Sequence, residues 1–307
     1  MQNCNMIEQI VSASDNTELY LHSWCVEESK AAVLLAHGMA EHSMRYAEFA
    51  EFLNANSIDF YCHDQRGHGK TAKGSLGVLR KGLDWKLMMD DLFTIKKKLI
   101  DTTSHCPVIL MGHSMGSFLV RCAVQVQPNL FDGLIISGTG DSQGLIGKAG
   151  EMLTKVLCST GEHAPANMMQ NMVFGGYNKA FTNPRTEFDW LSRDEAQVDL
   201  YIADPWCGFV CTNGFFHELL HGIQMANNPK GMSKMNKQMP VYLFSGDQDP
   251  VGNMGKGVAN VKIALDKAGL QDVTMRLYAE GRHEMLNELN KAEVMNDILA
   301  WVEEKIK

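Results

Sequence analysis

The sequence predicts an α/β protein with a mostly parallel, doubly wound sheet and a helical insertion. Short uninterrupted apolar runs recur along the chain, too short for helices and too continuous for half-exposed strands. Strands buried on both faces of a parallel sheet have this pattern. Segments with helical spacing of apolar residues lie between the runs, and alternating strands and helices favour a doubly wound sheet. One long stretch, residues 141–239, breaks the alternation.

The chain is expected to begin with a hairpin. Ile7–Ala13 and Glu18–Trp24 flank the turn-forming residues Ser14, Asp15 and Asn16. Two strand-like runs around such a turn favour antiparallel pairing.

Buried strands and helices are then expected to alternate. The strands are predicted at Ala32–Ala36, Ile58–Cys62, Val108–Met111, Leu134–Ser137, Val241–Ser245 and Val273–Tyr278. The helices are predicted at Asp84–Asp101, Ser117–Gln127, Lys256–Lys267 and Lys291–Ile306. In the first of these helices, apolar residues recur at spacings of three and four, which is the spacing of one helix face.

Residues 141–239 are expected to form a mostly helical lid, inserted into a core made of residues 1–140 and 240–307. Eight of the 20 methionines and many aromatic residues lie in the insertion. The run Ser192-Arg193-Asp194-Glu195 fits a capping box that opens a helix. Flexible Met-rich surface suits irregular aliphatic ligands, and pockets for such ligands are mostly apolar. The insertion is therefore expected to form an acyl-chain site.

Composition excludes several classes of protein. The 307 residues are 45% apolar and 21% charged, the balance of a chain that buries a core. A formal charge of −8 argues against nucleic-acid binding, which needs a basic surface. No apolar run approaches the length of a membrane span. The eight cysteines are scattered without a CxxC pair, and the N-terminus lacks the pattern of a signal peptide. A reduced, cytoplasmic protein is expected.

The strongest motif is Gly112-His113-Ser114-Met115-Gly116, a G-x-S-x-G. It follows a buried strand and precedes a predicted helix, which is the context that a nucleophilic serine on a sharp turn requires. The Met115 amide then lies at a helix N-terminus, where it can donate a hydrogen bond to an oxyanion. Ser114 is therefore the candidate nucleophile.

An acid and a base follow in the order found in α/β-hydrolases, which is serine, acid, histidine. Asp247 and Asp249 come directly after the strand Val241–Ser245, and His283 comes shortly after Val273–Tyr278. Ligands of such sheets bind at the carboxyl ends of the strands, so these loops are expected to meet Ser114. Only one aspartate can orient the imidazole, and the residues alone leave both open.

Two further loops follow predicted strands. In the first, Gly38 allows a sharp turn and the Met39 amide can be the second oxyanion donor. His37 and His42 of the same loop are interpreted as loop-bracing residues. The other loop, residues 64–69, contains glycines but no phosphate-binding motif, and is interpreted as a structural turn.

A competing motif is His217-Glu218-Leu219-Leu220-His221, which fits the H-E-x-x-H of zinc proteases. The residues after His221 lack the continuation of this motif that is found in metzincins. Neighbouring apolar residues indicate instead that this segment is a packed lid helix with the histidines at its flanks. A zinc peptidase is kept as a remote alternative.

The segments HGMAEHSMRY, HDQRGHGKT, GHSMGS, GDQDPVG and EGRHEMLNE, in this order, resemble the monoglyceride lipase and lysophospholipase branch of the serine α/β-hydrolases. The lid segment FDWLSRDEAQVDLYIADPWCGF also resembles that group. The resemblance implies the α/β-hydrolase fold, Ser114 as nucleophile, His283 as base and Asp249 as acid, since that branch places its aspartate three residues after the loop glycine. It also implies the Met39 and Met115 amides as the oxyanion hole.

The expected activity is hydrolysis of carboxylic esters with an aliphatic acyl group, of monoacylglycerol or lysophospholipid type, through an acyl-enzyme. No cofactor or metal is required. A peptidase on the same fold is the nearest alternative, and a non-catalytic ligand-binding relative is a remote one. The expected partner is a small ester or lipid-like substrate, with transient contact to a membrane surface rather than an integral segment, and no nucleic acid.

Overall fold

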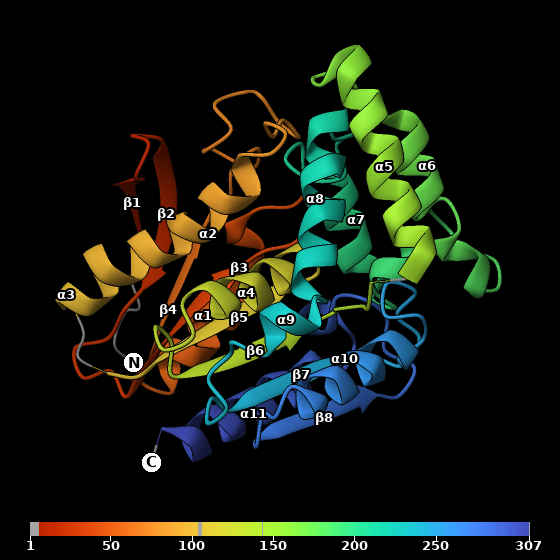
Figure 1. Cartoon of the computed structure of the whole chain (residues 1–307). Helices are drawn as coiled ribbons and strands as arrows, with labels where there is room; N and C mark the ends of the chain where they lie inside the picture. Colours follow the sequence, from red (N-terminus) through yellow and green to blue (C-terminus); the bar gives the residue numbers. More distant parts are fainter. Residues whose placement is uncertain (1–5, 104–105, 143, 307) are drawn as a thin grey trace.

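The computed structural model describes residues 6–103, 106–142 and 144–306, and shows one eight-stranded sheet (Figure 1). The strand order is β1-β2-β4-β3-β5-β6-β7-β8. The strands are β1 (Ile7–Ser12), β2 (Glu18–Trp24), β3 (Ala31–Ala36), β4 (Ile58–His63), β5 (Val108–His113), β6 (Gly133–Ser137), β7 (Val241–Gly246) and β8 (Val273–Tyr278). β1 pairs antiparallel with β2, and β2 antiparallel with β4, while β3 to β8 are mutually parallel. The predicted α/β fold and the hairpin are confirmed.

Helices cover both faces of this sheet. Successive residues of β3 point to opposite faces: Val33 and Leu35 pack with α1 (Ala47–Ala55) and α11 (Lys291–Lys305), whereas Leu34 belongs to the cluster of the other face. On that second face lie α2 (Asp84–Ile95), α4 (Met115–Val126) and α10 (Lys256–Lys267). Burial of a strand on both faces explains why its sequence is continuously apolar. The doubly wound arrangement is therefore confirmed.

The helix bounds differ in detail from those expected. Beyond α2 the chain continues through a π-helical turn, η2 (Lys96–Ile100), and α3 (Asp101–Thr103). α4 begins at Met115, two residues before the expected start, because Ser114 is its N-cap. The helix α1 and the preceding 3₁₀ turn η1 (Ser43–Tyr46) were not predicted.

Two predictions on local structure were wrong. The strand Val273–Tyr278 was expected to be buried on both faces, but Thr274, Arg276 and Leu277 are exposed, because β8 is the edge strand. The capping box at Ser192 was also wrong: the N-cap of α7 (Glu195–Ala203) is Asp194, whose carboxylate accepts from the Ala196 amide. Ser192 Oγ instead donates to the Asn287 carbonyl.

Between β6 and β7 the residues that the structure describes form only helices, turns and loops, apart from one isolated bridge. They are α5 (Gly144–Gly161), α6 (Asn167–Phe174), η3 (Tyr177–Ala180), η4 (Asp189–Leu191), α7, α8 (Asn213–Ala226) and α9 (Pro229–Met232). Figure 1 shows α5, α6, α7 and α8 (green to cyan) gathered beside one end of the sheet. Among the described residues, every helix is too short or too polar to cross a bilayer.

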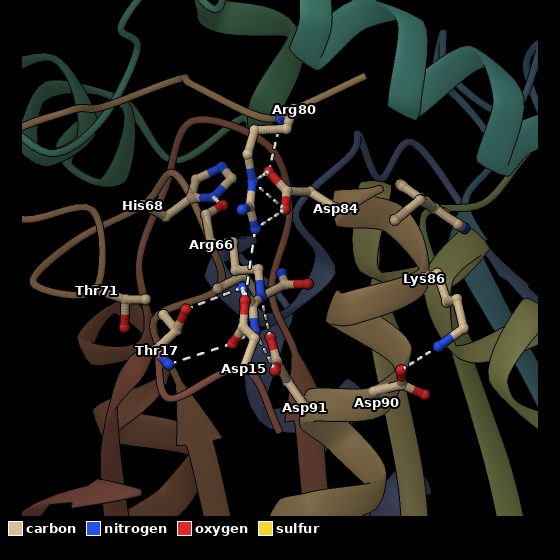
Figure 2. A network of polar contacts seen from close by, with 12 residues as sticks. Asp15, Thr17, Arg66, His68, Thr71, Arg80, Asp84, Lys86, Asp90 and Asp91 are labelled. Atoms are coloured by element: carbon tan, nitrogen blue, oxygen red, sulfur yellow. Dashed lines mark hydrogen bonds and ion pairs between the residues drawn. The ribbon is translucent and has the colours of Figure 1, made fainter. Parts of the chain in front are cut away.

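A buried arginine ties the N-terminal hairpin to the core (Figure 2). Arg66 follows β4 and makes bidentate ion pairs with Asp15 of the hairpin turn, at 2.8 and 2.9 Å, and with Asp91 of α2, at 2.7 and 2.8 Å. Planar guanidinium groups suit such paired carboxylates. This interaction joins three segments that are distant in the sequence, and it gives residues 64–69 the structural role that was predicted for them.

Candidate active site

Ser114 lies on a sharp turn between β5 and α4. Its φ is 52° and its ψ is −119°, a conformation that L residues rarely adopt. The Ser114 amide donates to the Ser137 carbonyl at 3.0 Å, and the Ser114 carbonyl accepts from the Ser117 amide at 2.9 Å. A backbone strained in this way persists only where surrounding contacts fix it, and such strain is concentrated at functional sites.

The two glycines of the motif are required by close packing. A Cβ on Gly116 would lie 2.0 Å from the Ala36 carbonyl oxygen, and a Cβ on Gly112 would lie 2.3 Å from the Gly116 oxygen. Real side chains do not approach backbone atoms this closely. The G-x-S-x-G spacing therefore lets β5 and α4 pack against the end of β3 while the turn displays the serine.

The structure brings Asp249, rather than Asp247, to His283. The Nδ1 atom of His283 lies 3.1 Å from Asp249 Oδ1 and 3.0 Å from Oδ2. Asp247 is instead a loop residue, whose Oδ1 accepts from the Glu280 amide at 2.8 Å. Of the two aspartates that the sequence left open, only Asp249 contacts the imidazole in the described structure.

Asp249 and His283 are both buried, and each favours the charged form of the other. Although burial opposes ionisation, the charge of His283 and hydrogen bonds from His283, Ser245 and Val251 lower the pKa of Asp249. Burial likewise opposes protonation of His283, but the charge and hydrogen bond of Asp249 outweigh it and raise the pKa of His283. A base held against a fixed carboxylate in this way is stabilised as an imidazolium.

Two aromatic rings lie close to the His283 imidazole. The Trp190 ring lies 5.1 Å from it and the His113 ring 4.7 Å, measured between centroids. Burial, together with the neighbouring His283, lowers the pKa of His113 to about 4, so His113 is neutral near pH 7. The backbone of the insertion also holds the loop that carries His283, because the Glu284 amide donates to the Leu191 carbonyl at 2.7 Å. Trp190 belongs to the lid segment singled out in the sequence, but no sequence pattern pointed to its contact with His283.

The candidate oxyanion donors, the amides of Met39 and Met115, both belong to residues that line the same cavity as Ser114. We call residues 38–41 the oxyanion loop. Among the described residues, no hydrogen bond outside the helices is donated by either amide. The Gly38 amide, in contrast, is held by Glu41 Oε1. The arrangement leaves the Met39 and Met115 amides available to a substrate oxygen.

The histidines near this loop act as braces. His37 Nε2 accepts from the Gln65 amide at 3.0 Å, and His37 Nδ1 donates to the Gly38 carbonyl at 2.8 Å. His42 Nε2 lies 2.8 Å from Asp204 Oδ2. These contacts confirm the interpretation of His37 and His42 as loop-bracing residues.

A buried ion-pair network joins the oxyanion loop to the His283 loop, and the sequence analysis missed it. Arg45 donates to Glu284 at 2.6 and 2.7 Å and to Glu41 at 2.9 Å. Burial opposes ionisation of Glu41. The charge of Arg45, with smaller contributions from His113 and His37, nevertheless lowers the pKa of Glu41 to about 2. Arg45 and Glu284 are too far apart in sequence for spacing to reveal the pair, although both lie within segments singled out above.

Ser114 and His283 line a cavity of about 500 Å³. Most of its lining residues come from the insertion, and aliphatic or aromatic side chains predominate among them. They include Ile146 of α5, Met169, Met172 and Phe174 of α6, and Leu219, Leu220 and Ile223 of α8. A cavity of this size and character fits a small, largely apolar ligand.

The His217–His221 segment is part of α8 and has a structural role. Glu218 is buried, and its carboxylate accepts from the amides of Gly82 and Trp85 at the start of α2. His217 Nδ1 lies 3.2 Å from Thr154 Oγ1, and His221 Nδ1 lies 3.1 Å from Glu151 Oε1. The glutamate and the two histidines thus have different partners, and among the described residues His217 and His221 belong to no group of three side chains that could hold a metal ion.

A different group of metal-compatible side chains exists among the described residues. His42, Asp204 and Cys207 place potential ligand atoms within 4.8 Å of one another. Burial, however, raises the pKa of the Cys207 thiol, although the nearby Arg45 opposes this. The positive charge of the nearby Arg45 disfavours a cation here, and His42 Nε2 is already paired with Asp204 at 2.8 Å.

Comparison with known proteins supports the same branch of hydrolases. The family model described as "Serine aminopeptidase, S33" matches residues 27–290. The monoglyceride lipase of Mus musculus is 25% identical over 304 residues, which are 95% of this chain and 89% of that protein. The monoacylglycerol lipase of Mycolicibacterium smegmatis is 27% identical over 280 residues, with 90% and 89% covered.

Solved structures share the fold. A thermostable carboxyl esterase from Bacillus coagulans, in complex with glycerol, has a TM-score of 0.91 at 24% identity, covering 98% of this chain and 99% of its own. A soluble variant of the monoglyceride lipase from Saccharomyces cerevisiae, bound to a substrate analogue, has a TM-score of 0.77 at 19% identity, covering 99% and 96%. The predicted resemblance is confirmed at the level of the family and the fold.

Proposed function

The chain belongs to the serine aminopeptidase S33 family, and from this premise we propose that Ser114, His283 and Asp249 are its catalytic triad. Its activity is the hydrolysis of carboxylic esters with an aliphatic acyl group. The relatives named monoglyceride or monoacylglycerol lipase favour this activity over that of an aminopeptidase. The observation that supports the assignment most strongly is the strained Ser114 in an apolar cavity with His283, whose Nδ1 faces Asp249.

In the first half-reaction, Ser114 Oγ attacks the ester carbonyl carbon while His283 takes the hydroxyl proton. The carbonyl oxygen becomes an oxyanion that accepts hydrogen bonds from the Met39 and Met115 amides. Collapse of the tetrahedral intermediate breaks the carbon–oxygen bond of the ester, and the departing alcohol takes the proton from His283. Asp249 holds the imidazole in orientation throughout and stabilises its charge.

In the second half-reaction, water attacks the acyl-enzyme. His283 takes a proton from the water, a second oxyanion forms in the same place, and the carboxylic acid leaves as Ser114 recovers its proton. No step requires a metal or an organic cofactor.

We propose that residues 141–239 act as a lid over a core formed by residues 1–140 and 240–307. The lid supplies most of the cavity lining, which matches a substrate with a long acyl chain, of monoacylglycerol or lysophospholipid type. On α5, Leu145 and Ile146 are 84% and 76% exposed, and exposed apolar residues of this kind favour transient contact with a lipid surface. A cytoplasmic location stays a prediction.

A matched pair of substrates tests the function. The octanoyl ester and the octanoyl amide of the same leaving group differ only in the bond to be cleaved. We expect hydrolysis of the ester to exceed that of the amide by far more than their difference in intrinsic reactivity. A chain that prefers the amide, or that requires a free amino group on the substrate, would be a peptidase.

A further inference from the structure

We propose that Tyr201, on α7 of the insertion, positions the oxyanion loop and thereby controls the rate of the chemical step. The inference rests on the proposed function, and it gives residues 141–239 a second role beyond lining the cavity. It derives from the hydrogen bonds that surround Met39, from the backbone conformation of Ala40, and from the packing of Tyr201.

The backbone groups on either side of the Met39 amide are held by side chains or by the insertion. The Gly38 amide donates to Glu41 Oε1, and the Ala40 amide donates to His68 Nε2 at 3.2 Å. The Ala40 carbonyl oxygen accepts two hydrogen bonds from the insertion, at 2.9 Å from the Tyr201 hydroxyl and at 3.0 Å from the Gly208 amide. The Met39 amide lies between these fixed points, so its direction depends on them.

The backbone at Ala40 is in a conformation that needs such support. Its φ is +54°, in the left-handed region, although it carries a side chain. Residues in this region persist where their surroundings over-determine them. Because the Ala40 carbonyl is bound by Tyr201 and Gly208, loss of one of these bonds is expected to let the loop relax and the Met39 amide turn away from the oxyanion position.

Tyr201 is packed against Gly208 and Arg45. Gly208 has a φ of +67°, and a Cβ there would lie 3.3 Å from Tyr201 Cε1, so the glycine lets the ring and its own amide reach Ala40 together. The guanidinium carbon of Arg45 lies over the Tyr201 ring, 4.8 Å from its centroid. Arg45 also binds Glu41 of the oxyanion loop. The hydroxyl is therefore aimed at the Ala40 carbonyl by a ring with little freedom to move.

Substitution of Tyr201 by phenylalanine separates the contribution of the hydroxyl from that of the ring. Tyr201→Phe keeps the ring, its burial and its contact with Arg45, and removes only the hydroxyl. A positional error of about 1 Å in catalytic groups costs on the order of 100-fold in rate. With Gly208 still bound to Ala40, we expect kcat for an octanoyl ester to fall by roughly 10- to 100-fold, while KM changes less than about twofold.

The experiment includes a readout that a merely structural role would not change. An octyl trifluoromethyl ketone forms a tetrahedral adduct that needs the oxyanion hole, whereas 1-octanol occupies only the apolar cavity. We expect Tyr201→Phe to weaken inhibition by the ketone by about the same factor as kcat/KM, and to leave inhibition by octanol unchanged. The number of folded sites is obtained by saturation labelling with a fluorophosphonate, and rates are expressed per labelled site.

Tyr242→Phe is the matched control. Tyr242 is also buried, and its hydroxyl is hydrogen-bonded to Tyr278 within the sheet rather than in the cavity. We expect its kcat, and its inhibition by both compounds, to equal those of the parent. If Tyr201→Phe hydrolyses the ester as fast as the parent, or loses ketone and octanol inhibition equally, the positioning role is wrong while the proposed function stands. A parent chain without esterase activity would instead overturn the proposed function.

Discussion

His283 Nδ1 lies 3.0 Å from Asp249 Oδ2, although the two residues are 34 positions apart and are contributed by loops after different strands. The carboxylate is itself fixed by the Ser245 hydroxyl and the Val251 amide, each at 2.9 Å. An imidazole with a carboxylate on Nδ1 is held in the tautomer whose Nε2 is a base. This pair is the basis of the first two predictions.

Replacement of the orienting carboxylate distinguishes the two aspartates of the loop. By analogy with the aspartate of serine proteases, we expect Asp249→Asn to reduce kcat by about 10⁴-fold. Asp247→Asn removes a carboxylate that caps the loop through the Glu280 amide, and we expect an effect below tenfold. Both are measured on an octanoyl ester at equal folded fraction. The opposite ranking would assign the acid to Asp247.

The pH dependence of kcat/KM follows from the raised pKa of His283. Only the neutral imidazole can accept the Ser114 proton, so activity is lost as pH falls through this pKa. Because Asp249 raises the pKa above the ordinary value of 6.5, we expect the acid limb of the profile to have its midpoint above 6.5. A midpoint below 6.5 would contradict the ion pair. Asp249→Asn should move the midpoint to lower pH, and Asp247→Asn should leave it unchanged.

Acyl chain length tests the apolar cavity. Each buried methylene contributes roughly 0.8 kcal/mol, a factor of about four in binding. From a two-carbon to an eight-carbon acyl ester, we therefore expect kcat/KM to rise well over tenfold before a plateau. The rates are measured below the aggregation limit of each substrate, because micelles would imitate a plateau. A flat or falling series would show that the cavity does not bind the acyl chain.

The Arg66 network is expected to contribute to stability rather than to activity. Arg66→Met leaves Asp91 buried without its partner, and loss of one member of a buried pair costs about 3–5 kcal/mol. The exposed pair of Lys86 and Asp90, also drawn in Figure 2, is the control. Lys86→Met should change the free energy of unfolding by less than about 1 kcal/mol. Urea denaturation measures the free energy of unfolding of both variants. Equal changes in the two would mean that the Arg66 network contributes no more to stability than the exposed pair.

The sequence was sufficient to predict features that depend on local pattern. Runs such as Ala32–Ala36 are apolar because both faces of β3 are buried, so the central strands were identified correctly. The order of Ser114, Asp249 and His283 after three strands was equally visible, because parallel strands bring their carboxyl ends to one edge. The resemblance, rather than the spacing, distinguished Asp249 from Asp247.

What the sequence did not reveal depends on contacts between distant segments. The Arg45–Glu284 pair and the bond from Tyr201 to Ala40 each join residues that are more than 150 positions apart. No periodicity encodes such contacts. The exposure of β8 was missed for a similar reason. Strand order decides whether a strand lies at the edge or the centre of the sheet, and the sequence of Val273–Tyr278 alone does not reveal that order.

The most direct test of the assignment is replacement of the candidate nucleophile. Ser114→Ala removes the hydroxyl that attacks the ester, and its own side chain is displayed in the cavity rather than packed in the core. Hydrolysis of an octanoyl ester is measured together with fluorophosphonate labelling and the melting temperature. We expect Ser114→Ala to lose both ester hydrolysis and labelling, with a melting temperature close to that of the parent. Hydrolysis by the variant at a rate comparable to that of the parent would contradict the assignment of Ser114.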